Sequence, residues 1–589
     1  MADLAPPPDA DEAATADEAD GGAEAPSADG GGGGRPPASR WVALAVALTA
    51  TVIVVLDNTV LSVAIPTIMR EFDTTLASLQ WVITGYALTF ATFLIIGGRL
   101  GDVYGHRKVF IVGASLFGIG SLLASVSWNV PSLVLGEALI EGLGASLMLP
   151  ATLAILSTTF QGKERAMAFG AWGAVAGSAA GLGPVLGGWL TSDYSWRWSF
   201  RINVIIAPIA IIGALIAFPK ARAGKREPLD LPGAALIASG MFLLVFALSE
   251  GGTYGWFTPI APLTMLGHQV WTADTPVAIT PVAFALSALL LYAFYRVERR
   301  KERLDQKPMF EFGLLRHRTF RYGLTTTVVL AMGQLGLGYA LALFLQQGKH
   351  LSALHNGLWI LPMGLSILIT SPIGGRLAQR IGTIRVIRIG LVIQASGLLW
   401  IAFHVGEGLT FWTLMPGLVG YGMGVGWASA QLTNVVLSEV PRAKAGVASG
   451  TNTTVRQVGS ALGIAVIGTL VTTQTIRHAT SSIQASPTLP GQVKAIAIDR
   501  IRHASSGYQA PRGTSGPLAE IGHIMTRSIG SGTQDALLFA AAVVIVGLGV
   551  SLLLPTDLPM HAAAGDTAEE LADELAPLVP IDPEGALVD

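Results

Sequence analysis

Long apolar segments recur along almost the whole chain, and they constrain the fold more than any other feature of the sequence. A helix needs roughly 20 apolar residues to cross a bilayer, and about fourteen segments of that kind can be placed. Hydrophobic residues make up 51% of the 589 residues and charged residues only 13%, which is too little polar surface for a soluble globule of this length. The sequence therefore predicts an all-α polytopic membrane protein. The expected spans lie near residues 41–66, 78–99, 108–127, 131–156, 166–190, 199–218, 231–249, 279–296, 321–345, 354–374, 384–403, 411–437, 445–473 and 534–555.

A short motif occurs twice and divides the chain into comparable halves. At residues 97–113 and again at 374–390, an apolar run ends in Gly-Gly-Arg-Leu, a short basic turn follows, and a second apolar run begins. A duplicated hairpin indicates a duplicated protein. We therefore expect six spans, two linker spans and six further spans, with the two halves facing each other across a central cavity.

Basic residues cluster in alternate short loops, and this pattern predicts the orientation of the chain. By the positive-inside rule, these loops and both tails are expected in the cytoplasm. The clusters include His106 to Lys108, Lys220 to Arg226, Arg296 to Arg321, Arg380 to Arg388, and Arg442 with Lys444.

The composition divides the chain into five regions. They are a disordered acidic tail (1–40), an N-terminal six-helix half (41–218), a linker region with two extra spans (219–320), a C-terminal six-helix half (321–555) and a second acidic tail (556–589). Two segments are expected on the outer side of the membrane. They are an irregular surface loop at about 250–278, of which the piece 259–267 alternatively dips into the membrane, and a long loop at about 474–533.

Three acidic residues fall inside expected spans, where a charged side chain costs free energy and therefore indicates a function. Asp57 lies toward the outer part of the first span, and Glu137 and Glu141 lie at a comparable depth in the fourth. The spacing of four residues puts both glutamates on one face of a helix. Like charges so close cannot all ionise, so the acids would share at least one proton if these faces meet. Alternatively, Asp57 is a neutral hydrogen-bonding group and Glu137 is solvated at the outer interface.

Small residues form a ridge on the fifth span, where Gly173, Gly177 and Gly181 recur at spacings of four. Such a ridge lets another helix approach closely, and the proline that follows it removes a backbone hydrogen bond and bends the span. The candidate hinge residues are Gly181, Gly183, Pro184, Gly187 and Gly188.

Other polar and aromatic side chains inside spans are candidates for the lining of a cavity, although an aromatic residue in a span more often packs or joins the interface belt. We expect Trp196, Trp198 and Trp412 in that belt. Arg456 is expected to face the cavity or an acid such as Glu439, and Arg201 to neutralise Glu137 or to reach the head groups. The cavity candidates are Trp81, Tyr86, Trp172, Gln334, Trp359, Gln394, Trp427, Gln431, Asn434 and Arg456.

Five segments make the membrane part, roughly 41–555, resemble the major facilitator superfamily, and within it the fourteen-span drug:proton antiporters of the EmrB/QacA subfamily. Residues 56–66 look like the first-span motif, 98–108 like the superfamily hairpin motif and 180–188 like the exporter motif of the fifth span. Residues 195–203 and 446–459 are further segments similar to those of the subfamily.

The resemblance implies efflux of amphipathic, often cationic compounds or secreted metabolites in exchange for inward protons, by rocking of the two halves. It gives Asp57 a role in proton coupling and makes the glycine and proline residues of the fifth span a bend associated with antiport. It also implies a cytoplasmic gate made of Gly98, Arg99, Asp102, Gly105, Arg107 and Lys108.

The chain departs from the family pattern at positions that matter for coupling. Relatives usually have an arginine and then a glutamine where this chain has Glu137 and Glu141, so the usual pairing of an aspartate with an arginine is missing. We therefore expect Asp57, Glu137 and Glu141 to form a proton-binding or cation-attracting cluster. In the second hairpin Gln379 replaces an acid, which predicts an asymmetric gate with a charge-paired latch only at Asp102.

Several other classes of protein are disfavoured. The chain has no cysteine, which excludes disulfides, thiol chemistry and cysteine metal sites, and it has no phosphate-binding loop that would indicate a built-in ATPase. No catalytic constellation appears, so we expect no enzyme activity, cofactor, metal site or nucleic-acid partner. The expected partners are a small amphipathic substrate, protons and the lipid bilayer, and the expected state is monomeric. A lipid or metabolite exporter with altered coupling, and a non-transporting membrane sensor or scaffold, remain alternatives.

Overall fold

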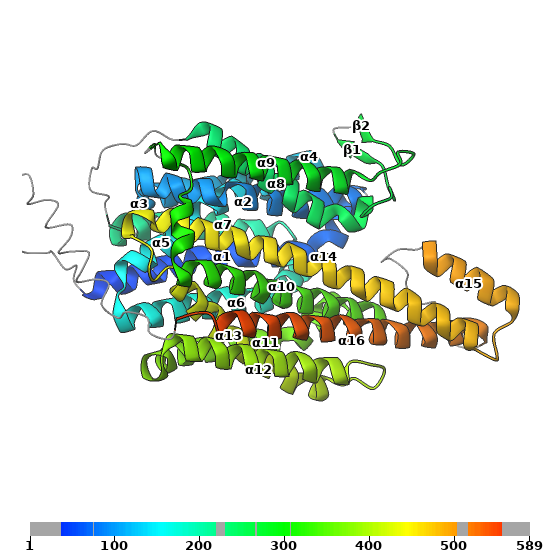
Figure 1. Ribbon diagram of the computed structural model, residues 1–589. Coiled ribbons are helices and arrows are strands. Elements are labelled where there is room, and N and C mark those ends of the chain that lie inside the picture. Colours follow the sequence, from blue (N-terminus) through cyan, green and yellow to red (C-terminus); the bar gives the residue numbers. More distant parts are fainter. Residues whose placement is uncertain are drawn as a thin grey trace, which may run out of the picture.

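A computed structural model describes the residues of the chain that surround and form its helices (Figure 1). The predictions for the two acidic tails fall almost entirely on residues outside this part. The described residues are 37–74, 76–219, 230–265, 268–304, 306, 308–503 and 516–555.

The described residues are almost all helical, and the long helices run side by side along one axis (Figure 1). The N-terminal half packs mainly through contacts of α1 with α6 and α7, and of α3 with α5 and α7. Its elements are α1 (Pro37–Glu71), α2 (Leu76–Tyr104), α3 (His106–Ser125), α4 (Val130–Leu133), the π-helix η1 (Val134–Glu141), α5 (Gly142–Thr159), α6 (Gly162–Asp193) and α7 (Trp198–Ala217).

Two helices that pack against each other, α8 (Leu231–Tyr254) and α9 (Ile279–Arg303), connect the halves and place α8 beside α2. The C-terminal half follows. Its long helices are α10 (Arg318–Leu343), α11 (Ala353–Ile381), α12 (Thr383–His404), α13 (Phe411–Val436), α14 (Ala445–Ala485) and α16 (Pro517–Ser551). The short elements of the linker region and this half are β1 (Leu263–Met265), β2 (His268–Trp271), η2 (Phe312–Arg316), η3 (Phe344–Gly348), η4 (Arg442–Lys444) and α15 (Gly491–His503).

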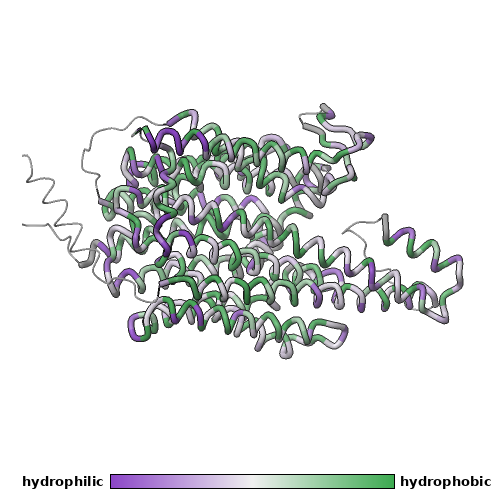
Figure 2. The backbone as a smooth tube through the Cα atoms, viewed as in Figure 1, coloured by the Kyte–Doolittle hydropathy of each residue, from purple (hydrophilic) through white to green (hydrophobic). Residues whose placement is uncertain are grey.

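The expected membrane-spanning character is confirmed. In the described part of the chain, twelve helical segments are long and apolar enough to cross a membrane. Figure 2 shows hydrophobic residues along the helices and hydrophilic residues gathered mostly at the two ends of the bundle. Two expected spans coincide with α6 and α13, which are 32 and 26 residues long but are not among the twelve. The count of fourteen spans therefore stays a prediction.

The prediction of a long outer loop at 474–533 is wrong, because most of its described residues are helical. The helix α14 continues to Ala485, α15 follows, and α16 begins at Pro517. These extensions reach past the other helices at the right of Figure 1. They share a buried apolar cluster that includes Ile483, Ile501 and Met525. Apolar residues at helical spacing continue beyond the membrane length, so the charged residues between them lie on helices and not in a loop.

The segment 250–278, predicted as an irregular loop, contains some regular structure, and the membrane-dipping alternative stays untested. The helix α8 continues to Tyr254, and β1 and β2 then form an antiparallel hairpin with an irregularity at Leu263. Trp271 donates a hydrogen bond from its indole nitrogen to the carbonyl oxygen of Val277 at 3.0 Å. The hairpin lies at the same end of the bundle as α15 (Figure 1).

Acidic side chains tie the segment between α9 and α10 to α9 and to the residue before α14. Glu298, which is fully buried, accepts a hydrogen bond from the backbone nitrogen of Phe310 at 3.0 Å. Glu311 in the same segment forms an ion pair with Lys444, the residue just before α14, at 2.5 Å. The linker region is thus attached to the C-terminal half beside the start of α14.

Glycine residues let helices of the N-terminal half touch through their backbones. A Cβ atom at Gly144 of α5 would lie 2.4 Å from the backbone nitrogen of Phe117 and 2.7 Å from the carbonyl oxygen of Gly113, both on α3. Real Cβ atoms do not come so close to a backbone, so the distance between α3 and α5 depends on this glycine. The same type of contact recurs where the functional residues lie.

The end of α1 is clamped to the start of α7. Glu71 forms an ion pair with Arg197, and it accepts a hydrogen bond from the indole nitrogen of Trp196 at 2.6 Å. Trp196 is only 1% exposed, so its predicted place in a lipid-facing belt is wrong, whereas Trp198 and Trp412 are exposed as that prediction requires. The tryptophan is inside because its indole N–H needs a polar partner and the carboxylate provides one.

We expect Gly144→Ala to lower the free energy of unfolding by about 1–3 kcal/mol, because the added methyl group forces the backbones of α3 and α5 apart. Gly338→Ala is the matched control, because Gly338 is also a helical glycine, on α10, but a Cβ atom added there would meet nothing within 4 Å. That change is expected to be neutral or stabilising by up to about 1 kcal/mol. Thermal unfolding in detergent measures both. Equal effects of the two substitutions would contradict the packing argument.

We expect the clamp at Glu71 to fail in acid. Partial burial opposes ionisation of Glu71, but hydrogen bonds from Trp196 and Arg197 outweigh it and hold the pKa of Glu71 below its ordinary 4.5. A pKa that is lower in the folded state adds stability above the unfolded value, and this stability disappears as the pH falls through the folded pKa. The difference in melting temperature between the wild type and Glu71→Gln should therefore shrink from about pH 6 to about pH 3.5. A difference that grows in acid would contradict the assignment.

Candidate functional site

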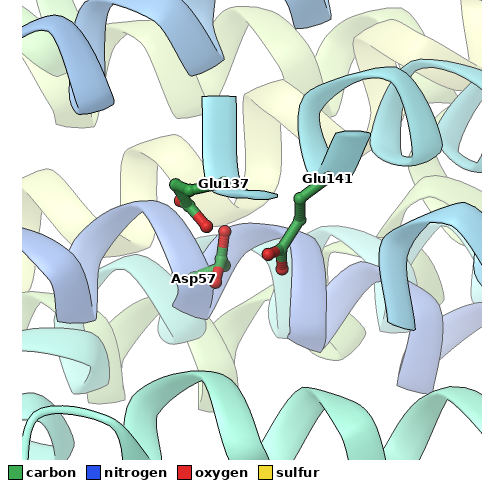
Figure 3. A group of neighbouring side chains, drawn as sticks. All are labelled: Asp57, Glu137 and Glu141. Atoms are coloured by element: carbon green, nitrogen blue, oxygen red, sulfur yellow. The ribbon is translucent and has the colours of Figure 1, made fainter. Parts of the chain in front are cut away.

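Three buried acidic side chains meet in the N-terminal half. Asp57 comes from α1, and Glu137 and Glu141 come from η1 (Figure 3). One carboxylate oxygen from each residue lies within 4.8 Å of those of the other two. The side chains are 4%, 0% and 0% exposed, respectively, so the alternative in which Glu137 is solvated at the interface is wrong. We call these three residues the acidic cluster.

The local backbone that presents the two glutamates is a π-helix, which no pattern in the sequence indicates. It is flanked by tight contacts with α3: a Cβ atom at Gly136 would lie 2.8 Å from the backbone nitrogen of Ala124, and one at Gly120 would lie 2.6 Å from that of Glu141. Single π-helical turns inside α-helices are frequent at functional sites. Glycine on both sides of the contact was the only signal in the sequence for this close approach.

Two neutral residues donate hydrogen bonds to two of the three carboxylates in the acidic cluster. The amide nitrogen of Asn203 on α7 donates to Asp57 Oδ1 at 2.9 Å and to Glu141 Oε1 at 3.1 Å. The hydroxyl of Ser121 on α3 donates to the same Glu141 oxygen at 2.5 Å. Asn203 lies in a segment noted for its family likeness but was not assigned a role. Ser121 was missed, because a serine in an apolar span gives no distinctive signal.

The remaining oxygens of the acidic cluster have no hydrogen-bond partner among the described residues. They are Asp57 Oδ2, both carboxylate oxygens of Glu137, and Glu141 Oε2. No described basic side chain forms an ion pair with the cluster. Arg201, which was considered as a partner for Glu137, is exposed and lies over the ring of Trp198 at 5.5 Å. Three neighbouring buried carboxylates without a counter-charge cannot all be ionised, so the cluster must take up protons or another cation.

Another acidic residue, outside the acidic cluster, joins the two halves. Asp102, in the last turn of α2, accepts hydrogen bonds from the backbone nitrogens of Gly446 at 2.7 Å and Val447 at 2.8 Å. These groups belong to the first turn of α14, where the helix dipole favours a negative charge. A Cβ atom at Gly98 would lie only 2.1 Å from the carbonyl oxygen of Gly446, so the backbones of α2 and α14 are in direct contact.

A basic residue of the hairpin also lies beside Asp102, and the predicted charge-paired latch stays a prediction. His106 Nε2 lies 3.5 Å from Asp102 Oδ1, and Arg107 donates to the carbonyl oxygen of Leu215 at 2.7 Å. The two aligned N–H groups at the start of α14 bind the carboxylate through charge-assisted hydrogen bonds. Lys108 is exposed and Arg99 is partly buried.

The two hairpins share one backbone conformation, which supports the interpretation as a duplication. Gly105 between α2 and α3 has φ 93° and ψ 129°, and Gly382 between α11 and α12 has φ 93° and ψ 143°. Residues with a side chain rarely adopt this positive φ. Both turns therefore require glycine.

Further hydrogen bonds between the halves lie at the same end as Asp102, which is the end where the described chain begins and finishes (Figure 1). The side chain of Gln431, predicted to line a cavity, takes part in one of them. The bonds run from Arg165 to the carbonyl of Leu437 (2.9 Å), from Gln431 to that of Ala166 (3.3 Å), from Ser371 to that of Gly170 (2.8 Å), and from Ser449 to that of Pro150 (2.9 Å).

Arg456, which lies farther from that end of the bundle, contacts the N-terminal half. Its guanidinium carbon lies 5.5 Å from the ring centroid of Trp172, and its nitrogen donates to the hydroxyls of Ser429 at 3.1 Å and Thr433 at 3.3 Å. The alternative partner, Glu439, instead accepts a hydrogen bond from Thr319 at 2.6 Å. Of the predicted cavity residues, Trp172 and Arg456 are thus in direct contact.

The other predicted cavity residues are spread over both halves. Tyr86 is 1% exposed, and its hydroxyl has no hydrogen-bond partner among the described residues. The rest have separate surroundings. Trp81 packs against Phe246, Trp359 packs against Phe411, and Trp427 donates a hydrogen bond to the carbonyl oxygen of Thr370. Gln394 is buried in the core, and Gln334 and Asn434 are partly buried.

The glycine ridge of α6 packs as predicted. A Cβ atom at Gly173 would lie 2.4 Å from that of Ala430 on α13, and one at Gly177 would lie 2.3 Å from Ile367 on α11. At Gly187 the close neighbour is Val60 on α1, 2.9 Å away. The predicted bend stays untested: α6 is continuous to Asp193, and the side-chain surroundings of Gly181 and Pro184 lie outside the described residues. Gly183 and Gly188 lie in the same helix.

These features define a polytopic helical membrane transporter built from two related halves that meet at one end. The sequence matches the Major Facilitator Superfamily over residues 47–464, and the chain belongs to this family. It is a multi-pass transport protein and not an enzyme. The fourteen-span drug:proton subfamily remains a prediction.

Relatives support the family assignment over most of the chain. A probable actinorhodin transporter of Streptomyces coelicolor is 36% identical over 446 residues, which cover 74% of this chain and 73% of the relative. A tetracenomycin C resistance and export protein of Streptomyces glaucescens is 30% identical over 88% of this chain and 91% of its own length. A puromycin resistance protein of Streptomyces alboniger is 33% identical, over 78% and 89% respectively.

A solved structure supports the fold alone. The crystal structure of the human organic anion transporter MFSD10 (TETRAN) aligns with a TM-score of 0.55 and 15% sequence identity. The alignment covers 88% of this chain and 100% of the human one.

We expect Asp102→Ala to open the contact between α2 and α14. A cysteine placed at Ser449, a fully buried site between α14 and α5, reports this opening through maleimide labelling, and the chain has no other cysteine. Labelling should rise about ten-fold, because hydrogen bonds to a charged group contribute about 1.5–3 kcal/mol. The matched change in the second hairpin, Gln379→Ala, should alter labelling little. The reverse order would contradict an asymmetric gate.

Proposed function

We propose that this protein exports small amphipathic compounds across the cell membrane in exchange for protons, by alternating access of its two halves. The observation that carries the proposal is the acidic cluster: three buried carboxylates with no basic partner among the described residues, inside a transporter fold. Such a group must gain and lose cations as water reaches it from one side or the other. The Streptomyces relatives include a probable actinorhodin transporter, a puromycin resistance protein and a tetracenomycin C resistance and export protein, and they support export of such compounds.

We place both termini, and the end that carries Asp102, in the cytoplasm. The alternate short loops at this end hold the basic clusters, which supports the assignment through the positive-inside rule. In this orientation the described conformation has its cytoplasmic side closed, because Asp102 and the hydrogen bonds around it join the halves there. The halves 41–218 and 321–555 would rock about the contacts of α6 with α11 and of α2 with α14.

The proposed coupling works through the charge of the acidic cluster. Protons that enter from outside neutralise Asp57, Glu137 and Glu141, and this removes the free-energy penalty of burying them while the outer side closes. Opening of the cytoplasmic side rehydrates the cluster and releases the protons. Asn203 donates to two of the carboxylates and therefore stabilises their ionised forms.

Substrate would pass between the halves, where Trp172 and Arg456 meet. An aromatic ring beside a guanidinium offers both an apolar face and a charged group to an amphipathic molecule. The lipid bilayer supplies a second source of such substrates. We propose that the protein works as a monomer, because both halves of the pathway belong to one chain.

We expect Asp57→Asn and Glu137→Gln each to reduce proton-driven efflux about ten-fold or more in proteoliposomes, because a carboxamide cannot exchange the coupled proton. Ethidium and puromycin are the probes, and a pH gradient drives their transport. Glu250→Gln, which removes a carboxylate that is 3% exposed on α8 outside the cluster, is the control and should keep most of the activity. Full efflux in both cluster variants would refute the proposed coupling, and no efflux by the wild type would favour a sensor or scaffold.

A further inference from the structure

We propose that Asp57, Glu137 and Glu141 bind a hard metal cation of about the size of Ca²⁺, in competition with protons. This inference rests on the proposed function only in using the same site. It assigns the acidic cluster a ligand that the proton-coupling role does not require.

The donor atoms of the acidic cluster are all oxygens. They come from its three carboxylates, while the cluster contains no histidine and the whole chain has no cysteine. Carboxylate and hydroxyl oxygens favour hard cations such as Ca²⁺, whereas zinc and copper prefer nitrogen and sulfur ligands.

The spread of the carboxylates fits one ion. Three oxygens at about 2.3–2.6 Å from a single Ca²⁺ lie up to about 4.5 Å apart. The carboxylate oxygens of the acidic cluster lie within 4.8 Å of one another, so shifts of a few tenths of an ångström would bring all three into contact with the ion. A smaller ion such as Mg²⁺, with oxygens at about 2.0–2.1 Å, would require larger shifts.

The hydrogen bonds of the cluster leave oxygens available for an ion. Asn203 and Ser121 bond to Asp57 Oδ1 and Glu141 Oε1, and thereby fix the orientation of two carboxylates. Both oxygens of Glu137 are buried without a hydrogen-bond partner among the described residues, and Figure 3 shows this carboxylate directed toward Asp57. The Tyr86 hydroxyl, from the neighbouring α2, is likewise buried and unpartnered. Buried oxygens without donors are costly unless a cation or a proton satisfies them.

The charge of the surroundings also favours a cation. The side chains that hydrogen-bond to the cluster are Ser121 on α3 and Asn203 on α7, and both are neutral. No described lysine, arginine or histidine forms an ion pair with it. Up to three negative charges are therefore balanced only by bound cations. A divalent ion would displace about two protons, so its binding should weaken as the pH falls.

Equilibrium binding of radioactive Ca²⁺ to the purified full-length protein in detergent, after removal of metal with EGTA, tests the site. We expect about one Ca²⁺ per chain at about pH 7.5 and at least about ten-fold weaker binding at about pH 5.5, because protons compete for the same oxygens. Glu137→Gln and the double variant Glu137→Gln/Glu141→Gln should weaken binding at least about ten-fold. Glu250→Gln should bind like the wild type. No saturable binding, or unchanged binding in the double variant, would overturn the proposal.

Three further measurements make the outcome interpretable. Thermal unfolding without metal shows that each variant is folded, and Ca²⁺ should raise the melting temperature of the wild type but not of the double variant. Tighter binding of Mg²⁺ or Na⁺ than of Ca²⁺ would overturn the inferred size and charge of the ion. Efflux of ethidium in EGTA separates the two proposals. Efflux without Ca²⁺ binding refutes the metal site alone, and Ca²⁺ binding without any efflux refutes the proposed transport alone.

Discussion

Close contact between helix backbones is the constraint on which both functional regions depend. At Gly120 and Gly136 the helix α3 touches η1, and this contact holds two glutamates against Asp57 on α1. At Gly98 and Gly446 the helix α2 touches α14, which brings Asp102 onto the first N–H groups of that helix. In a bilayer the hydrophobic effect does not drive helices together, so packing between small residues has to supply much of the association energy.

The two acidic regions differ in how their charge is balanced. Asp102 receives two backbone hydrogen bonds at a helix N-terminus, which suits a carboxylate that stays charged and holds the halves together. Among the described residues, the acidic cluster has only the amide of Asn203 and the hydroxyl of Ser121 as donors for three carboxylates. A fixed partner suits a gate, whereas an unbalanced cluster suits a group that exchanges ions between two sides of a membrane.

Much of this protein could be predicted from the sequence, and the failures have physical reasons. The membrane-spanning character, the duplicated hairpin and the acids at matching depth follow from local patterns. The π-helix at 134–141 and the helical extensions of α14 and α16 do not, because a helix continues or widens according to what packs against it. Trp196 was placed at the lipid interface because its partner, Glu71, lies 125 residues away in the sequence.

The sequence by itself determined the class of the protein: apolar segments of spanning length, a repeated hairpin motif and family motifs establish an all-α transporter of the Major Facilitator Superfamily. It also supplied the residues of the candidate site. Only the tertiary structure decided that Asp57, Glu137 and Glu141 meet with no basic partner in the described part of the chain, and that Asp102 binds the start of α14. The reason is that these contacts join helices distant in sequence, and the rotation of each helix is set by its neighbours and not by its own residues.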